Sequence, residues 1–264
     1  MDLGIKGKIA VVSGSTAGIG FAIANTLAQE GAEVIVNGRT QARVDAAIAK
    51  INGGAAKVDV RGIAADLSNA AGVQAFTKAV ADADILVNNL GIFEPKPFAE
   101  IADADWLRFF EANVMSGVRL SRQYLPGMLR KNWGRIIFIS SESGQQIPAE
   151  MIHYGVTKTA QIAVARGIAE SVAGTNVTVN SVLVGPTASE GVGTFVDEMA
   201  RNQRISKKEV EKKFFESLRP SSLLKRFETP EEVAAVVAFV ASAQSATING
   251  AAVRADGGVV RSIL

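Results

Sequence analysis

Tyr154 and Lys158 are the residues of this chain whose types and spacing best suit acid–base chemistry. Side chains four residues apart lie on one face of a helix. A free tyrosine, with a pKa of about 10, is a poor base at neutral pH. An ammonium group about 4 Å away, at an effective dielectric of about 20, would contribute roughly 4 kcal/mol and lower that pKa by about three units. The pair can therefore hold a phenol that exchanges protons near neutral pH, although the same spacing also arises by chance on solvated helix faces.

Two further polar residues accompany this pair. Ser141 lies thirteen residues before Tyr154, directly after the β-branched run at 135–139, and Asn113 lies within the helical region before that run. Ser140 competes with Ser141 for the same role, but successive strand residues point to opposite faces, which directs Ser140 elsewhere. The sequence thus predicts Ser141 beside the tyrosine–lysine pair.

A glycine-rich turn follows the first apolar run. It spans Gly14 to Gly20 and reads Gly-x-x-x-Gly-x-Gly. Glycines at such a turn allow a backbone to approach a pyrophosphate closely, and the following helix N-terminus offers free N–H groups to phosphates. The spacing differs from the common Gly-x-Gly-x-x-Gly fingerprint. Its position between a strand and a helix still favours a dinucleotide site.

The end of the second apolar run indicates which dinucleotide binds. Enzymes that use NAD usually carry an acidic residue there for the ribose hydroxyls, whereas this chain reads Asn37-Gly38-Arg39. A carboxylate would repel a 2′-phosphate, while Arg39 can donate two charge-assisted hydrogen bonds to it. The sequence therefore favours NADP(H) over NAD(H), which stays open because Arg39 could be a surface residue or stack on adenine.

Short apolar runs alternate with longer amphipathic ones along the whole chain. We predict strands at 9–12, 34–36, 57–64, 85–87, 135–139, 177–183 and 251–254. We predict helices at 21–29, 41–51, 69–80, 104–131, 152–172 and 230–240, with Pro126 breaking or kinking the fourth of them. Repeated strand–helix units require right-handed crossovers and a parallel sheet with helices on both faces. The expected fold is α/β, a Rossmann-type doubly wound parallel sheet of about seven strands in one domain covering 1–264.

The segment at about 187–226 interrupts this alternation. It holds two helical fragments, 196–201 and 206–218, and lies at a strand end where ligands bind. We expect a substrate lid, the alternative being a solvated insertion without a role. Its apolar residues suggest an apolar substrate, although helical spacing suits core packing equally. These residues are Phe195, Met199, Phe214 and Phe215.

Composition excludes several classes of protein. The chain has 264 residues, no cysteine and one histidine, so disulfides, thiolate catalysis and cysteine- or histidine-rich metal centres are excluded, and we expect no metal. The net charge of +2 is too small for a nucleic-acid binder. No signal peptide and no run of about 18 apolar residues is evident. We therefore expect a cytoplasmic protein that binds neither nucleic acid nor membrane.

Together these features resemble the short-chain dehydrogenase/reductase family, in its compact single-domain branch that includes the 3-oxoacyl-carrier-protein reductases. The matching motifs run in order over nearly the whole chain: Gly14-x-x-x-Gly18-x-Gly20, Asp66, Asn88-Asn89-Leu90-Gly91, Asn113, Ser141, Tyr154-x-x-x-Lys158, Asn180 and Gly185-Pro186-Thr187. Two positions depart from the family pattern. Leu90 stands where alanine is usual, and Val184-Gly185-Pro186 replaces the usual Pro-Gly.

The resemblance implies a role for each catalytic residue. Tyr154 would be the general acid in reduction and the base in oxidation, and Lys158 would also hydrogen-bond the nicotinamide ribose. Ser141 would donate to the substrate oxygen. Asn113 would anchor a water that links Lys158 to solvent.

The resemblance also implies which residues contact the cofactor and how the chains assemble. The cofactor contacts would be Gly14, Ser15, Thr16, Gly18, Ile19, Gly20, Arg39, Asp66, Leu67, Asn89, Gly91, Tyr154, Lys158, Gly185 and Thr187. Family members are commonly homotetramers joined through their long helices, and we expect the same here.

The expected function is NADP(H)-dependent interconversion of a carbonyl and a secondary alcohol on a small molecule. A catalytically idle dinucleotide-binding sensor or scaffold is the alternative from another class, and a sensor has no need of the complete catalytic set. Within the enzyme class, a 3-oxoacyl thioester reductase and an NAD-dependent alcohol dehydrogenase stay open. Arg130 and Lys131 could meet an acidic carrier protein, or be ordinary solvated residues. His153 could line the substrate pocket, but helix neighbours point in different directions.

Overall fold

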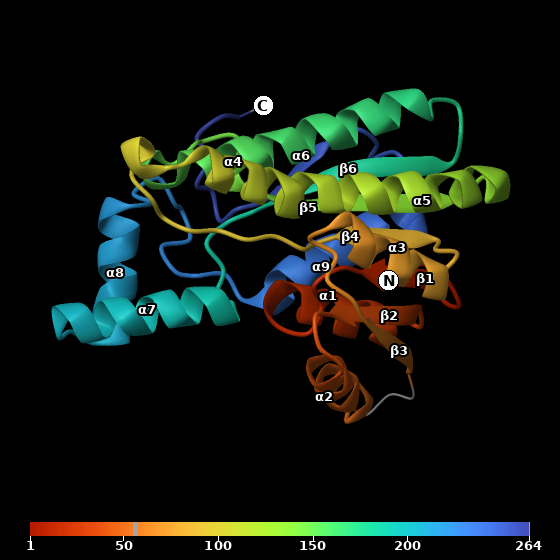
Figure 1. The fold of residues 1–264 in the computed structure, drawn as a ribbon, viewed down its shortest axis with the longest axis horizontal. Helices are drawn as coiled ribbons and strands as arrows, with labels where there is room; N and C mark the ends of the chain where they lie inside the picture. Colours follow the sequence, from red (N-terminus) through yellow and green to blue (C-terminus); the bar gives the residue numbers. More distant parts are fainter. Residues whose placement is uncertain (55–57, 264) are drawn as a thin grey trace.

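Seven parallel strands form a single sheet in the order β3-β2-β1-β4-β5-β6-β7 (Figure 1). The computed structural model describes residues 1–54 and 58–263, with the side chain of Phe195 also outside the description. The strands are β1 (Ile9–Val12), β2 (Glu33–Gly38), β3 (Asp59–Ala64), β4 (Ile85–Asn88), β5 (Gly134–Ser141), β6 (Val177–Val184) and β7 (Ala252–Ala255). Strands β2 and β3 are added on one side of β1, and β4 to β7 on the other side. The switch point of a doubly wound sheet therefore lies between β1 and β4. The predicted fold is confirmed; Lys57, the predicted start of β3, lies outside the described residues.

Helices cover both faces of the sheet and enclose two apolar cores. One face carries α1 (Gly18–Gln29), α2 (Gln41–Asn52) and α9 (Pro230–Ala241). The other carries α3 (Ala70–Ala79), α5 (Ser116–Lys131) and α6 (Ile152–Ser171), with α4 (Asp103–Phe110) packed on α6. Strands β4, β5 and β6 are buried at every position, as expected for parallel strands between two helical layers. Short 3₁₀ turns lie at Phe98–Glu100, Glu142–Gly144, Ala149–Met151 and Ala243–Ser245.

The long helix predicted at 104–131 is interrupted, but not at Pro126. A π-helical turn over Glu111–Met115 separates α4 from α5, and α5 continues through Pro126. Pro126 therefore does not break the helix, and the alternative of a kink at Pro126 stays a prediction. Pro126 has no N–H to donate to the carbonyl of Arg122. Both residues lie on the exposed side of the helix, where water can donate to that carbonyl instead.

The segment between β6 and α9 holds two helices, α7 (Glu190–Gln203) and α8 (Lys207–Ser217), which pack on each other. They extend beyond the sheet on the side where the strands end (Figure 1). We refer to residues 187–226 as the α7–α8 segment. Among the residues described, no helix combines the length and the apolar composition needed to cross a bilayer.

Candidate active site

Two adjoining cavities lie at the carboxyl ends of the strands. The Gly-rich cleft, of about 560 Å³, is lined by the turn after β1 and by the ends of β2 and β3. The Tyr154 cavity, of about 240 Å³, is lined by the ends of β5 and β6 and by the start of α6. Ile19, Asn89, Gly91, Phe93 and Ser189 line both. A molecule lying in the cleft can therefore reach into the cavity.

The Gly-rich cleft is built to receive phosphates. Gly14 and Gly18 adopt φ values of +62° and +55°, which L residues with side chains rarely take. The N-cap of α1, Ala17, supplies no side-chain hydrogen bond to the first turn, which contains no acidic residue. The N–H groups of that turn are thus left for an anion in the cleft. This donor set fits the pyrophosphate of a dinucleotide.

Ser15 and Asn37 hold the turn in place from behind. The Ser15 hydroxyl donates to the Val12 carbonyl at 2.7 Å and accepts from the Asn37 N–H at 2.9 Å. The Asn37 amide accepts from the Gly14 N–H and donates to the carbonyls of the β3 end at 3.1–3.2 Å. The side chain of Ser15 is fully buried and does not line the cleft, unlike the other predicted residues of this turn.

Two arginines stand at the end of the cleft beyond β2. Arg39 lines the cleft and is exposed, and its charge contributes to the lowered pKa of Asp66, after hydrogen bonds from Ser68. Arg43, which the sequence analysis did not single out, lines it as well. Arg43 forms an ion pair at 2.8 Å with Glu190, the first residue of α7. The α7–α8 segment therefore contacts the arginine end of the cleft.

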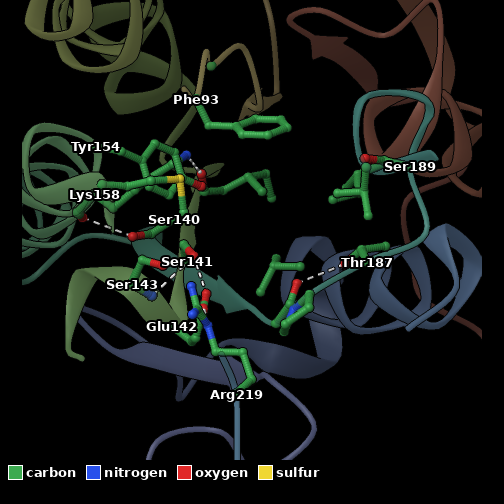
Figure 2. A pocket seen from close by; sticks show the side chains of 18 of the residues that line it. Phe93, Ser140, Ser141, Glu142, Ser143, Tyr154, Lys158, Thr187, Ser189 and Arg219 are labelled. Carbon is green, nitrogen blue, oxygen red and sulfur yellow. Dashed lines mark hydrogen bonds and ion pairs between the residues drawn. The ribbon is translucent and has the colours of Figure 1, made fainter. Parts of the chain in front are cut away.

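Tyr154, Lys158 and Ser141 come together on one wall of the Tyr154 cavity (Figure 2). The Lys158 Nζ donates to the Ile139 carbonyl at 2.8 Å and lies 5.6 Å from the centroid of the Tyr154 ring. Ser140 donates to the Lys158 carbonyl at 2.8 Å, which anchors the helix rather than the substrate. The strand alternation expected for the two serines agrees with this arrangement.

Burial acts on the two titratable groups of this wall in opposite directions. Desolvation lowers the pKa of Lys158 to about 8 and raises that of Tyr154. The negative charge of Glu142 raises the pKa of Tyr154 further, and a hydrogen bond with Ser141 lowers it. Burial and the charge of Glu142 therefore raise the pKa of Tyr154, in the direction opposite to the lowering expected from the lysine.

Asn113 lies in the π-helical turn between α4 and α5. Its side-chain amide accepts from the Ile92 N–H at 2.7 Å and donates to Thr157 at 2.9 Å, while its own carbonyl faces α6. The Gln161 amide donates to this carbonyl at 2.6 Å and accepts from the Lys158 Nζ at 3.2 Å. Gln161 therefore bridges the Asn113 carbonyl and Lys158, between which the family resemblance implies a bound water.

Glu142 and Arg219 form a buried ion pair beside Ser141, at 2.8 Å. The other carboxylate oxygen of Glu142 accepts a hydrogen bond from the Ser141 hydroxyl, and Arg219 also pairs with Glu150 at 3.0 Å. Both members of the pair are less than one-tenth exposed and line the cavity (Figure 2). Sequence reasoning missed them, although Glu142 directly follows the predicted strand-end serine and Gln161 lies three residues beyond Lys158.

The other predicted residues divide by location. Gly185 and Thr187 line the Tyr154 cavity, with Thr187 on the side opposite Tyr154 (Figure 2), and Asp66 and Leu67 line the Gly-rich cleft. His153 is fully buried between α4 and α6, with its ring 4.0 Å from that of Phe109, and does not line either cavity.

The apolar residues predicted in the lid do not behave alike. Phe214 lines the cavity, whereas Phe215 is buried in aromatic packing with Phe227. Met199 is absent from the lining of both cavities, and the side chain of Phe195 lies outside the described residues. The α7–α8 segment nevertheless contributes Thr187, Ser189, Val192, Phe214, Leu218 and Arg219 to the Tyr154 cavity.

Arg130 and Lys131 end α5, just before β5 begins, and so lie at the edge of the sheet opposite the cavities. Lys131 forms ion pairs with Asp82 and Asp84 at 2.6 and 2.8 Å. A carrier protein as partner stays a prediction.

Comparison with known proteins agrees with this geometry. The model of the short chain dehydrogenase family matches residues 8–200. The chain is 47% identical to the uncharacterized oxidoreductase YvaG of Bacillus subtilis, over 100% of both chains. It is 34% identical to the D-beta-hydroxybutyrate dehydrogenase of Cupriavidus necator, over 97% of this chain and 99% of that one. The crystal structure of L-sorbose reductase from Gluconobacter frateurii, complexed with NADPH and L-sorbose, matches with a TM-score of 0.93 and 32% identity over 100% of both chains.

Proposed function

The chain belongs to the short-chain dehydrogenase family and is an oxidoreductase, and on this basis we propose that it interconverts a carbonyl and a secondary alcohol with NADP(H). The observation that carries the proposal is the wall formed by Tyr154, Ser141 and Lys158, which adjoins a cleft suited to a dinucleotide. A bound nicotinamide would supply or accept the hydride.

The residues of the wall divide the proton chemistry between them. Tyr154 donates a proton to the carbonyl oxygen in reduction and accepts it from the alcohol in oxidation. The Lys158 ammonium stabilises the phenolate that reduction leaves behind, and the Ile139 carbonyl and Gln161 fix its position. Ser141 hydrogen-bonds the substrate oxygen and orients it towards Tyr154.

The arginine end of the cleft supports NADP(H) over NAD(H). Arg39 and Arg43 both line the cleft where a 2′-phosphate would lie. Asn37 stands at the end of β2, where an NAD enzyme usually has a carboxylate, and its amide is already engaged by backbone groups. We expect Arg39→Ala to raise KM for NADPH about tenfold and to leave KM for NADH nearly unchanged. An unchanged preference for NADPH in this variant would contradict the assignment.

The α7–α8 segment is proposed as the substrate lid, because it supplies one side of the Tyr154 cavity. The lining combines aromatic and aliphatic side chains with the buried Glu142–Arg219 pair. Such a cavity suits a small ketone with both apolar and polar parts. The homotetramer and the cytoplasmic location stay predictions.

The reaction is tested by following the loss of NADPH absorbance with a panel of ketones. The panel comprises aliphatic ketones, 3-oxo acids and their thioesters, and polyhydroxylated ketones such as L-sorbose. We expect turnover on at least one class. Tight NADPH binding without turnover on any of them would favour a dinucleotide sensor instead.

A further inference from the structure

Glu142 places a carboxylate in the wall of the Tyr154 cavity, directly beside Ser141 (Figure 2). One of its oxygens accepts a hydrogen bond from the Arg219 Nε at 2.8 Å, and the other accepts from the Ser141 hydroxyl. The residue is only 4% exposed. An ionised carboxylate can accept hydrogen bonds but cannot donate them. Glu142 therefore offers the cavity an acceptor next to the position of the reacting oxygen.

Arg219, on the same side of the cavity, is already engaged by two carboxylates. Its Nε pairs with Glu142, and its Nη1 donates to Glu150 at 3.0 Å and to the Leu218 carbonyl at 2.8 Å. Two carboxylates and one guanidinium carry one net negative charge. A carboxylate on the substrate would have to displace one of these partners and lie beside the other. This side of the cavity therefore suits an uncharged group that donates a hydrogen bond.

Binding of a ketone changes the hydrogen bonding of Ser141. Its hydroxyl accepts from the Ser143 N–H at 3.1 Å and donates to Glu142. A hydroxyl has one proton, so Ser141 must withdraw that proton from Glu142 in order to donate to a ketone oxygen. The buried carboxylate oxygen then lacks a donor, which is unfavourable unless another group replaces it. A hydroxyl on the substrate can do so.

From this geometry, and resting on the proposed function, we propose that the substrate is an uncharged hydroxy ketone. Its carbonyl oxygen accepts from Ser141, and a hydroxyl on the neighbouring carbon donates to Glu142. The two oxygens of such a ketone can lie about one hydrogen-bond length apart, as the Ser141 and Glu142 oxygens do. Glu142 is thus a residue that determines specificity, while Tyr154 supplies the proton. In the direction of oxidation the substrate is a vicinal diol.

Two ketones of nearly equal shape test the role of the hydroxyl. Hydroxyacetone has a hydroxyl where butanone has a methyl group, on the carbon next to the carbonyl. We expect kcat/KM of the wild type to be about 10²-fold higher for hydroxyacetone, because butanone leaves Glu142 without a donor. Equal kcat/KM values for the two ketones would overturn the proposal.

Glu142→Gln tests whether Glu142 is the acceptor. Arg219 can only donate, so the amide oxygen of the variant must face it, and the amide N–H groups then face Ser141. The preference for hydroxyacetone over butanone should therefore fall at least about tenfold. Both substrates are compared in the same protein, so differences in the amount of folded enzyme cancel. An unchanged preference would contradict the assignment of Glu142.

Glu150 provides the matched control. Glu150→Gln removes the same charge from the same arginine, but Glu150 has no described hydrogen bond to Ser141. We expect this variant to keep the wild-type preference between the two ketones. Equal losses of preference in Glu142→Gln and Glu150→Gln would assign the effect to charge and overturn the proposed hydrogen bond. NADPH binding, followed by fluorescence, shows that each variant is folded.

Acetoacetate and its ethyl ester test the charge requirement in the wild type, without any substitution. We expect kcat/KM to be at least about tenfold higher for the uncharged ester, because Arg219 is already paired with both carboxylates. A preference for acetoacetate would show that Arg219 receives a substrate carboxylate, and it would rule out the uncharged substrate proposed here.

A binding measurement separates this inference from the proposed function. Calorimetry gives Kd of hydroxyacetone and butanone for the enzyme–NADP⁺ complex, which has no hydride to transfer. Hydroxyacetone should bind about tenfold more tightly than butanone in the wild type, and this ratio should be lost in Glu142→Gln. Ketone reduction without these preferences would overturn the inference and leave the proposed function standing. The binding preference without turnover on any ketone would instead indicate failure of the proposed function.

Discussion

Lys158 and Tyr154 show how burial shapes the chemistry of single residues at this site. Desolvation disfavours the charged form of each, so it lowers the pKa of the lysine and raises that of the tyrosine. The two groups are held by partners that the sequence motif does not contain. Gln161 accepts a hydrogen bond from the lysine, and the charge of Glu142 raises the pKa of the tyrosine.

Gln161 also contributes to stability, because it satisfies two buried polar groups. In Gln161→Leu, the Asn113 carbonyl loses this donor and Lys158 loses an acceptor. We expect the free energy of unfolding to fall by about 1–3 kcal/mol and kcat to fall with it. Urea denaturation measures the first effect, with Gln123→Leu on the exposed side of α5 as the control. Equal stability of the two variants would contradict the role assigned to Gln161.

The raised pKa of Glu228 makes the stability of the protein depend on pH. Burial and the neighbouring Asp256 raise its pKa from 4.5 to about 7, and the smaller effect of the Gly185 backbone N–H, which lowers it, does not offset this rise. Between these two pH values the folded chain binds more protons than the unfolded chain, so stability falls as pH rises through the window. The contribution of protonated Glu228 to the free energy of unfolding is fully present below pH 4.5, its pKa in the unfolded chain, and is lost above about pH 7.

Glu228→Gln should therefore be more stable than wild type at about pH 8, by about 2–3 kcal/mol, and equal to it at about pH 4. Urea denaturation at the two pH values measures this difference. The control is Glu231→Gln, an exposed residue in the first turn of α9. A wild type that is more stable than Glu228→Gln at the higher pH would show that the carboxylate is favourably bound when folded.

At the scale of elements, the α7–α8 segment links the two cavities. It begins after β6, pairs Glu190 with Arg43 at the cofactor end, and brings Arg219 onto Glu142 at the catalytic end. The Arg43–Glu190 pair is half-exposed, so it contributes little to stability in water, whereas the Arg219–Glu142 pair is buried. The segment is therefore anchored more firmly beside Ser141 than beside the arginines.

A 2′-phosphate that binds Arg43 must compete with Glu190. We expect Glu190→Gln to lower Kd for NADPH about twofold to threefold and to leave Kd for NADH unchanged. High salt should remove the difference, since both side chains are solvated. Fluorescence titration measures both constants, with Glu198→Gln on the exposed side of α7 as the control. An equal fall in Kd for NADH would show that Glu190 does not act on the 2′-phosphate site.

At the scale of the whole molecule, the sheet and the position of the site were predictable, because each depends on interactions between residues close together in the sequence. Buried runs such as Ile9–Val12 and the turn after Gly14 have signatures within a few residues. Interactions between distant segments have no such signature. Arg219 reaches Glu142 across 77 positions, and nothing in its neighbours indicates that contact.

The same limit explains the errors within elements. Helix periodicity does not reveal where a π-turn forms, so the interruption was assigned to Pro126 instead of Glu111–Met115. Motif matching identified Ser15 with its turn, but the serine side chain is used behind the cleft. Pattern reasoning therefore located the site, and the structure supplied the partners that tune it.

The central claim is that Tyr154 exchanges a proton with a carbonyl oxygen during hydride transfer. The most direct test compares NADPH oxidation by wild type and Tyr154→Phe, using the ketone that wild type reduces best. We predict that kcat falls by about 10²–10⁴-fold in the variant while Kd for NADPH is unchanged. Equal turnover by the two proteins would contradict the account.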